Sequence, residues 1–143
     1  VTQPTTLNRC PNSWGHYNHY SFDALNISEL WIGSIPVKLA FPDGSSASVK
    51  SCKDVAVKVV TWFGSKGRLP QLPFRGLGRG QRWFLNTIPQ HESGKKMNKP
   101  YRLDIGNKIV FVDTNRSASE FVVCLNALCK ECGEAPSRFA IYQ

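Results

Sequence analysis

The chain has 143 residues, which is the size of one domain and too short for two independent cores. Hydrophobic residues make up 41% of it and charged residues 20%, a composition that excludes a disordered tail and a coiled coil. No apolar run approaches the roughly 18 residues of a membrane-spanning helix, and residues 1–6 have neither a basic start nor an apolar stretch. We therefore expect a soluble chain from which any signal peptide has been removed.

The net charge of +8 is concentrated in one segment. Residues 64–102 carry nine basic side chains and a single acidic one, Glu92, whereas the other 104 residues carry nine of each sign. Charge localised in this way indicates a polyanionic or acidic partner.

The chain has five cysteines, an odd number and a high density for a cytosolic protein of this size. They are Cys10, Cys52, Cys124, Cys129 and Cys132. Two Asn-x-Ser sequons make Asn26 and Asn115 candidate glycosylation sites. Together these features predict an extracellular setting, either as a secreted protein or as the ectodomain of a surface protein.

Residues 1–29 are polar and aromatic without sustained periodicity, which predicts an irregular N-terminal extension in front of a domain over residues 30–143. Residues 35–41 alternate and lead into a Pro-Asp-Gly turn, so a strand is expected there, and the alternation returns at 47–52. Residues 55–63 are rich in β-branched side chains and predict a largely buried strand.

Residues 64–99 are expected to form an expanded middle loop with one short strand at 82–85. Four further strands are expected, at 101–105, 108–113, 120–125 and 138–142. No long stretch keeps a period of 3.6 residues, so the pattern predicts an all-β domain built as a sandwich or barrel.

Cys52, Trp62 and Cys124 fall in three of these expected strands, in the order Cys, Trp, Cys. With the residues that precede the two cysteines, 43–51 and 116–123, this pattern resembles a domain of the immunoglobulin superfamily in its I-set or V-set form. The resemblance implies a two-sheet sandwich in which a Cys52–Cys124 disulfide joins the sheets and Trp62 packs beside it.

Three cysteines remain, Cys10, Cys129 and Cys132. The Cys129-x-x-Cys132 pair lacks the second pair of ligands that a zinc site needs and the βαβ context of a redox motif. We expect Cys10 to bond to Cys129 or Cys132 and so tie the extension to the domain, which leaves one thiol over.

The sequence indicates neither an enzyme nor a metal site. His16 and His19 have no cluster of carboxylates or cysteines nearby, and His91 has no readable Ser-His-Asp arrangement around it. The glycine-rich residues 75–80 fit neither a phosphate loop nor a dinucleotide fingerprint. We therefore expect no catalysis, no cofactor and no metal.

The expected binding surface is the basic segment, where arginines stand among the aromatic residues Phe74, Trp83 and Phe84. This mixture suits contacts to phosphate or sulfate and stacking on bases or on a protein surface. The candidate binding residues are Lys66, Arg68, Arg75, Arg79, Arg82, Trp83, Lys95, Lys96 and Lys99. The alternatives are a sulfated glycan such as heparin, an acidic protein face, a nucleic acid, or a solvated loop whose charges only aid solubility.

Two functions fit these features. The first is a secreted or cell-surface recognition module, such as a receptor or cell-adhesion domain, which binds a protein partner and favours acidic surfaces through its basic loop. The alternative is a nucleic-acid-binding protein, as found in viruses, that uses residues 66–102 as its contact surface. Intact disulfides and glycan favour the first function, whereas free thiols without glycan favour the second.

Overall fold

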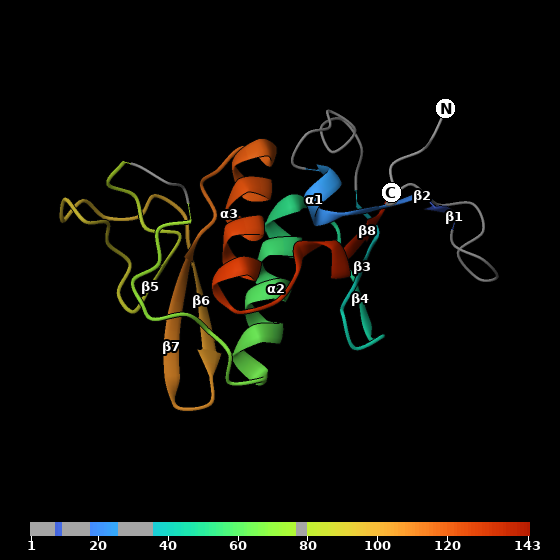
Figure 1. The fold of residues 1–143 in the computed structure, drawn as a ribbon. Coiled ribbons are helices and arrows are strands. Elements are labelled where there is room, and N and C mark those ends of the chain that lie inside the picture. Colours follow the sequence, from blue (N-terminus) through green and yellow to red (C-terminus); the bar gives the residue numbers. More distant parts are fainter. Residues whose placement is uncertain (1–7, 10–17, 26–35, 77–79) are drawn as a thin grey trace.

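Two helices separate two small antiparallel sheets in the computed structural model, which describes residues 8–9, 18–25, 36–76 and 80–143 (Figure 1). The helical elements are α1 (Phe22–Leu25), α2 (Cys52–Ser65), α3 (Ala118–Glu131) and the 3-10 helix η3 (Pro136–Arg138). The larger sheet has the order β1-β2-β8-β3-β4, with β1 (Asn8–Arg9), β2 (Asn18–Ser21), β3 (Lys38–Ala40), β4 (Ser46–Ser48) and β8 (Ala140–Tyr142). The smaller sheet has the order β5-β7-β6, with β5 (Leu85–Asn86), β6 (Pro100–Ile105) and β7 (Lys108–Asp113).

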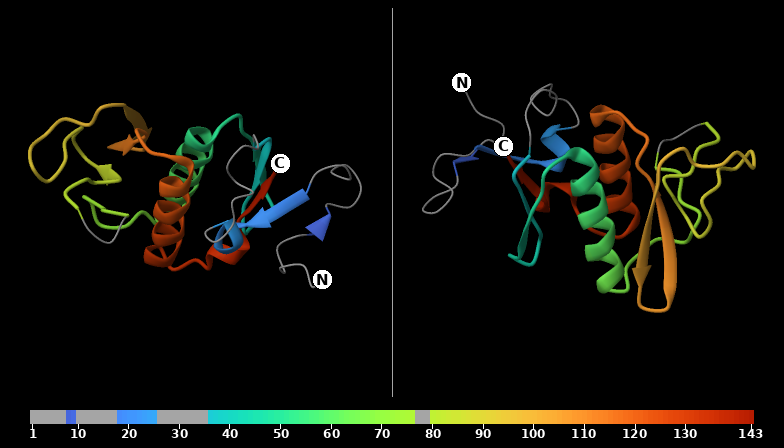
Figure 2. Two further views of the ribbon diagram at one scale, coloured as in Figure 1. Left: turned by 90° about the horizontal axis from the view of Figure 1, so that it is seen from above. Right: turned by 180° about the vertical axis from the view of Figure 1, so that it is seen from behind.

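Seen from above, α2 and α3 form the middle layer, with the larger sheet on one side and the hairpin of β6 and β7 on the other (Figure 2). The two helices contact each other, and α2 also contacts β6. None of the described helices is both long and apolar enough to cross a membrane.

The expected all-β sandwich of the immunoglobulin type is wrong. Cys52 and Trp62 both lie in α2, and Cys124 lies in α3, so none of the three residues stands in a strand. Cys52 and Cys124 are free thiols, and the disulfide implied by the resemblance is therefore wrong as well. Cys129 and Cys132 are also free thiols, whereas their expected partner Cys10 lies outside the described residues.

α2 forms where a strand is expected at 55–63 because its apolar residues also repeat every four positions. Val55, Val59 and Phe63 lie on one buried face of the helix. Ser51 caps its start, with Oγ accepting a hydrogen bond from the backbone N–H of Asp54 at 3.1 Å. The cap and the buried helical face outweigh the preference of valine for strands, which is weak compared with tertiary packing.

α3 replaces the strand expected at 120–125 for the same reason. Its first turn is a capping box: Ser117 Oγ accepts the N–H of Glu120 at 3.2 Å, and the Glu120 carboxylate accepts the N–H of Ser117 at 2.9 Å. Phe121, Leu125 and Leu128 then lie on the buried face of the helix.

The strands expected at 101–105 and 108–113 are found as β6 and β7, whereas those expected at 35–41 and 138–142 are shortened to β3 and β8. The strands expected at 47–52 and 82–85 are found only in part, since β4 ends at Ser48 and β5 begins at Leu85. Within the expected N-terminal extension, β2 pairs with β8, so these residues belong to the larger sheet.

Trp62 packs in an aromatic cluster rather than on a disulfide. Its indole stacks on Phe41, with 5.5 Å between ring centroids, and meets Phe139 edge-on at 5.5 Å. Phe22 of α1 stacks on the same Phe139 at 5.1 Å. The cluster thereby joins α1 and α2 to the chain that enters the larger sheet.

Candidate functional site

A concave pocket of about 570 Å³ gathers part of the basic segment where the chain enters β5 and leaves β7. We call it the basic pocket, and it is lined by Gln81, Arg82, His91, Ser93, Lys95, Lys96, Met97, Asn98 and Asn115. None of these residues is acidic, and four of them carry an amide or hydroxyl group. The pocket therefore offers a ligand both cations and neutral hydrogen-bond donors.

Lys95 and Lys96 stand on a tight turn that is anchored to the domain. The backbone N–H of His91 donates to the carbonyl of Lys95 at 2.8 Å, and Gly94, with φ of +86°, closes the turn. The side chain of Met97, directly after the two lysines, is buried. The expected middle loop is thus fixed at this point and holds both lysines in place.

Behind the pocket lies a buried carboxylate, Asp113, at the end of β7. Arg82 Nη2 donates to Asp113 Oδ2 at 2.7 Å, and Arg116 Nη2 lies 3.2 Å from the same oxygen. The other oxygen, Oδ1, accepts the backbone N–H of Asn115 at 3.1 Å. Because two guanidinium groups share this one carboxylate, Asp113 does not cancel the positive charge of the pocket.

His91 joins this network to the main chain. Its Nδ1 accepts the backbone N–H of Trp83 at 3.0 Å, so in the neutral ring Nε2 carries the proton, 3.8 Å from Asp113 Oδ2. Burial lowers the pKa of His91 below its usual value, although the nearby Asp113 carboxylate opposes the shift. Because Nδ1 faces the Trp83 amide and Nε2 faces Asp113, His91 is suited to positioning the turn rather than to proton transfer.

The free cations of the pocket are its two lysines. Lys95 and Lys96 are exposed, and neither makes an ion pair within the described part of the chain. Arg82 adds a third positive group because its side chain stays 39% exposed despite the contact with Asp113. An anion entering the pocket would therefore meet three cations and no carboxylate on the wall.

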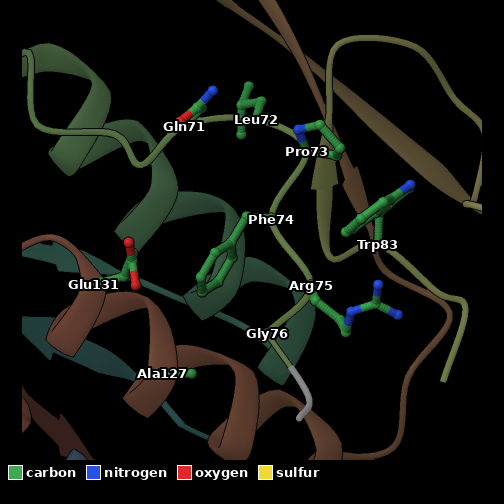
Figure 3. Close-up of a pocket in the computed structure, with 9 residues that line it drawn as sticks. All are labelled: Gln71, Leu72, Pro73, Phe74, Arg75, Gly76, Trp83, Ala127 and Glu131. Carbon is green, nitrogen blue, oxygen red and sulfur yellow. The ribbon is translucent and has the colours of Figure 1, made fainter. Parts of the chain in front are cut away.

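A second pocket, of about 630 Å³, lies between Trp83 and α3 (Figure 3). We call it the aromatic pocket, and it is lined by Gln71, Leu72, Pro73, Phe74, Arg75, Gly76, Trp83, Ala127 and Glu131. The guanidinium of Arg75 lies 4.6 Å from the centroid of the Trp83 ring. The two pockets are neighbours, since Arg82 lines the basic pocket and Trp83, the next residue, lines the aromatic one.

The structure therefore divides the expected binding residues. Arg82, Lys95 and Lys96 line the basic pocket, whereas Arg75 and Trp83 line the aromatic pocket. Three others line neither: Lys66 pairs with Asp43 at 3.2 Å, Arg68 pairs with the buried Glu134 at 3.0 Å, and Lys99 is exposed. Arg79 lies outside the described residues.

Several members of the site are not singled out by charge or motif. Asp113 and Arg116 are ordinary charged residues in the sequence, and only the pairing of β5 with β7 brings them to Arg82. Asn115, expected as a glycosylation site, is exposed and lines the basic pocket, so a glycan there would obstruct it. The other sequon, at Asn26, lies outside the described residues.

The thiols of the described chain are suited to packing and not to nucleophilic attack or metal binding. Burial raises the pKa of Cys124 and of Cys132 to about 11 and raises that of Cys129 still further. Such thiols stay protonated at neutral pH, where a thiolate would be needed for attack or metal binding. Within the described residues, no group of three or more His, Cys, Asp or Glu side chains could hold a metal ion.

No protein-family model matches the chain, and neither a curated protein nor a solved structure is significantly similar to it.

Proposed function

We propose that this protein is a nucleic-acid-binding domain whose basic pocket holds phosphate groups of the ligand. The observation that carries the proposal is the pair of exposed lysines, Lys95 and Lys96, beside the half-exposed Arg82 in a pocket whose described wall residues include no acid. Contacts of lysine and arginine with phosphates supply most of the affinity in nucleic-acid binding. The amide groups of the wall add the neutral hydrogen bonds that commonly go to phosphate and sugar oxygens.

Two features favour this function over a secreted module that binds an acidic protein. The four described cysteines are free thiols, and the sequon at Asn115 lies where a glycan would obstruct the basic pocket. The aromatic pocket beside the lysines also suits nucleic acid, because bases stack on the rings of aromatic side chains. The extracellular location and the absence of catalysis stay predictions.

The proposal is tested by fluorescence anisotropy with a labelled single strand of mixed sequence and with its duplex, at several salt concentrations. We expect binding that weakens as salt rises, with a log–log slope of about −0.7 for each phosphate contact to a single strand. The variant Lys95→Gln/Lys96→Gln should bind roughly tenfold more weakly, and its slope should be shallower by about 1.4, since two contacts are lost.

The matched control is Lys50→Gln/Lys58→Gln, which removes the same charge from two exposed positions, one just before α2 and one in its middle. This control should keep the slope of the wild type, because its lysines lie outside both pockets. Equal losses in the two double variants would mean that only total charge matters, and the pocket would not be the site. Binding to heparin or to polyglutamate without binding to either nucleic acid would overturn the proposal.

A further inference from the structure

The aromatic pocket has a different electrostatic character from the basic pocket. Among the described residues that line it, Arg75 is the only cation, and the Nη2 of Arg75 lies 2.6 Å from Glu92 Oε1, so its charge is already balanced. Glu131, the last residue of α3, adds an exposed carboxylate that makes no ion pair in the described part of the chain. A phosphate group would be repelled here, and the pocket therefore suits an uncharged group.

The shape and composition of the wall suit a flat ring. The half-buried rings of Phe74 and Trp83 both line the pocket, and the guanidinium of Arg75 lies against the Trp83 ring. The contact with Glu92 holds that guanidinium in place. A nucleobase can stack on an indole ring or on an arginine plane, and such stacking tolerates any base.

The polar edge of the pocket can distinguish between bases. In Figure 3, Glu131 lies across the pocket from Trp83. A carboxylate only accepts hydrogen bonds, so it attracts the amino group of cytosine or adenine and repels the O4 carbonyl that thymine presents at the same position.

We propose that the aromatic pocket is a base-binding subsite for single-stranded nucleic acid that prefers a base with an exocyclic amino group to thymine or uracil. The inference rests on the proposed function, because the phosphate next to this base would lie in the adjoining basic pocket. It requires a single strand, since a base stacked inside a duplex cannot enter a pocket without being flipped out.

The test compares oligo-dC with oligo-dT of about 12 nucleotides, a length that single-strand-binding domains commonly cover. The wild type should bind oligo-dC at least about fivefold more tightly than oligo-dT. Glu131→Gln should erase most of this preference, because an amide can donate to O4 as well as accept from an amino group. Trp83→Leu should weaken the binding of both strands by about tenfold through lost stacking.

Asp104→Asn is the matched control, since it neutralises an exposed carboxylate of β6 that pairs with Arg102 at 3.2 Å and lines neither pocket. It should keep the preference for oligo-dC, and thermal melts should show that Glu131→Gln is folded. Equal binding of both strands by the wild type, or an unchanged preference in Glu131→Gln, would overturn the subsite. In that case the proposed function would still stand if binding depended on Lys95 and Lys96, whereas binding of neither strand would remove both proposals.

Discussion

Asp113 and Arg116 form an ion pair in which neither side chain is exposed, with 3.2 Å between Arg116 Nη2 and Asp113 Oδ2. The same guanidinium lies 3.4 Å from Cys124 Sγ and 3.4 Å from the carbonyl of Trp83. This pair links the end of β7 to α3 and to the chain that enters β5. It therefore supports the wall between the two pockets from behind.

Replacing Asp113 with asparagine should destabilise the protein by about 3 to 5 kcal/mol, the usual cost of leaving one partner of a buried pair uncompensated. Asparagine keeps the shape and can still accept the N–H of Asn115, so the loss reports the charge. The free energy of unfolding in urea measures it. The exposed pair of Arg102 and Asp104 is the control, and Asp104→Asn should change stability by less than about 1 kcal/mol. Similar losses in the two variants would show that Asp113 has no special role.

The hairpin of β6 and β7 could be predicted from the sequence, whereas the residues of both long helices were expected to form strands. Residues 101–105 and 108–113 alternate about a Gly-Asn turn, and this local pattern has one natural outcome. Residues 55–63 are ambiguous, because a run of valines suits a buried strand and also a buried helical face. The signals that separate the two are Ser51 with Asp54 and Ser117 with Glu120, which mark the starts of helices.

Part of the site could also be predicted. The charge pattern singles out Arg82, Lys95 and Lys96, since local density of charge is visible in a sequence. The charge pattern cannot show that Arg68 pairs with Glu134, nor that Asp113 lies behind Arg82, because these contacts depend on tertiary packing between distant segments.

The thiols give a second prediction, best measured in a Cys10→Ser variant so that only the described cysteines remain. The reaction of Cys124, Cys129 and Cys132 with a disulfide reagent at pH 7.5 should be at least about a hundredfold slower in the native protein than after unfolding. A rise in pKa from 9.0 to about 11, as at Cys124, alone reduces the thiolate about a hundredfold. The intact mass of this variant, measured under non-reducing conditions, provides the check. A mass lower by two hydrogens would reveal a disulfide and contradict the free thiols.

The packing of α2 against β6 gives a third prediction. A methyl group placed on Gly64 would lie 2.5 Å from Ile105 Cδ1 and 2.9 Å from its Cγ2. Gly64→Ala should therefore destabilise the protein by about 1 kcal/mol, because overpacking costs about 1 to 3 kcal/mol and the better helix propensity of alanine returns part of it.

A double-mutant cycle with Ile105→Val tests the cause of that loss. The shorter side chain removes the Cδ1 atom, so Gly64→Ala should cost less in the Ile105→Val background than in the wild type. The free energies of unfolding of the four proteins give the coupling. Additive effects would place the strain elsewhere than at Ile105.

The last prediction concerns pH and His91, whose pKa is lowered in the folded protein mainly by burial, with Asp113 opposing the shift. In the unfolded chain a histidine titrates near 6.5, so as pH falls through that value the unfolded state takes up a proton before the folded state does. The contribution of His91 to stability is therefore present above about pH 6.5 and decreases as pH falls, by at most about 1.4 kcal/mol per pH unit.

In His91→Gln, whose side-chain oxygen can still accept the N–H of Trp83, this part of the pH dependence should be absent. Urea unfolding at pH 7.5, 6.5 and 5.5 compares the two proteins, and carboxylates and the other histidines are common to both. A fall of the same size in wild type and variant would show that His91 titrates alike in the folded and unfolded states.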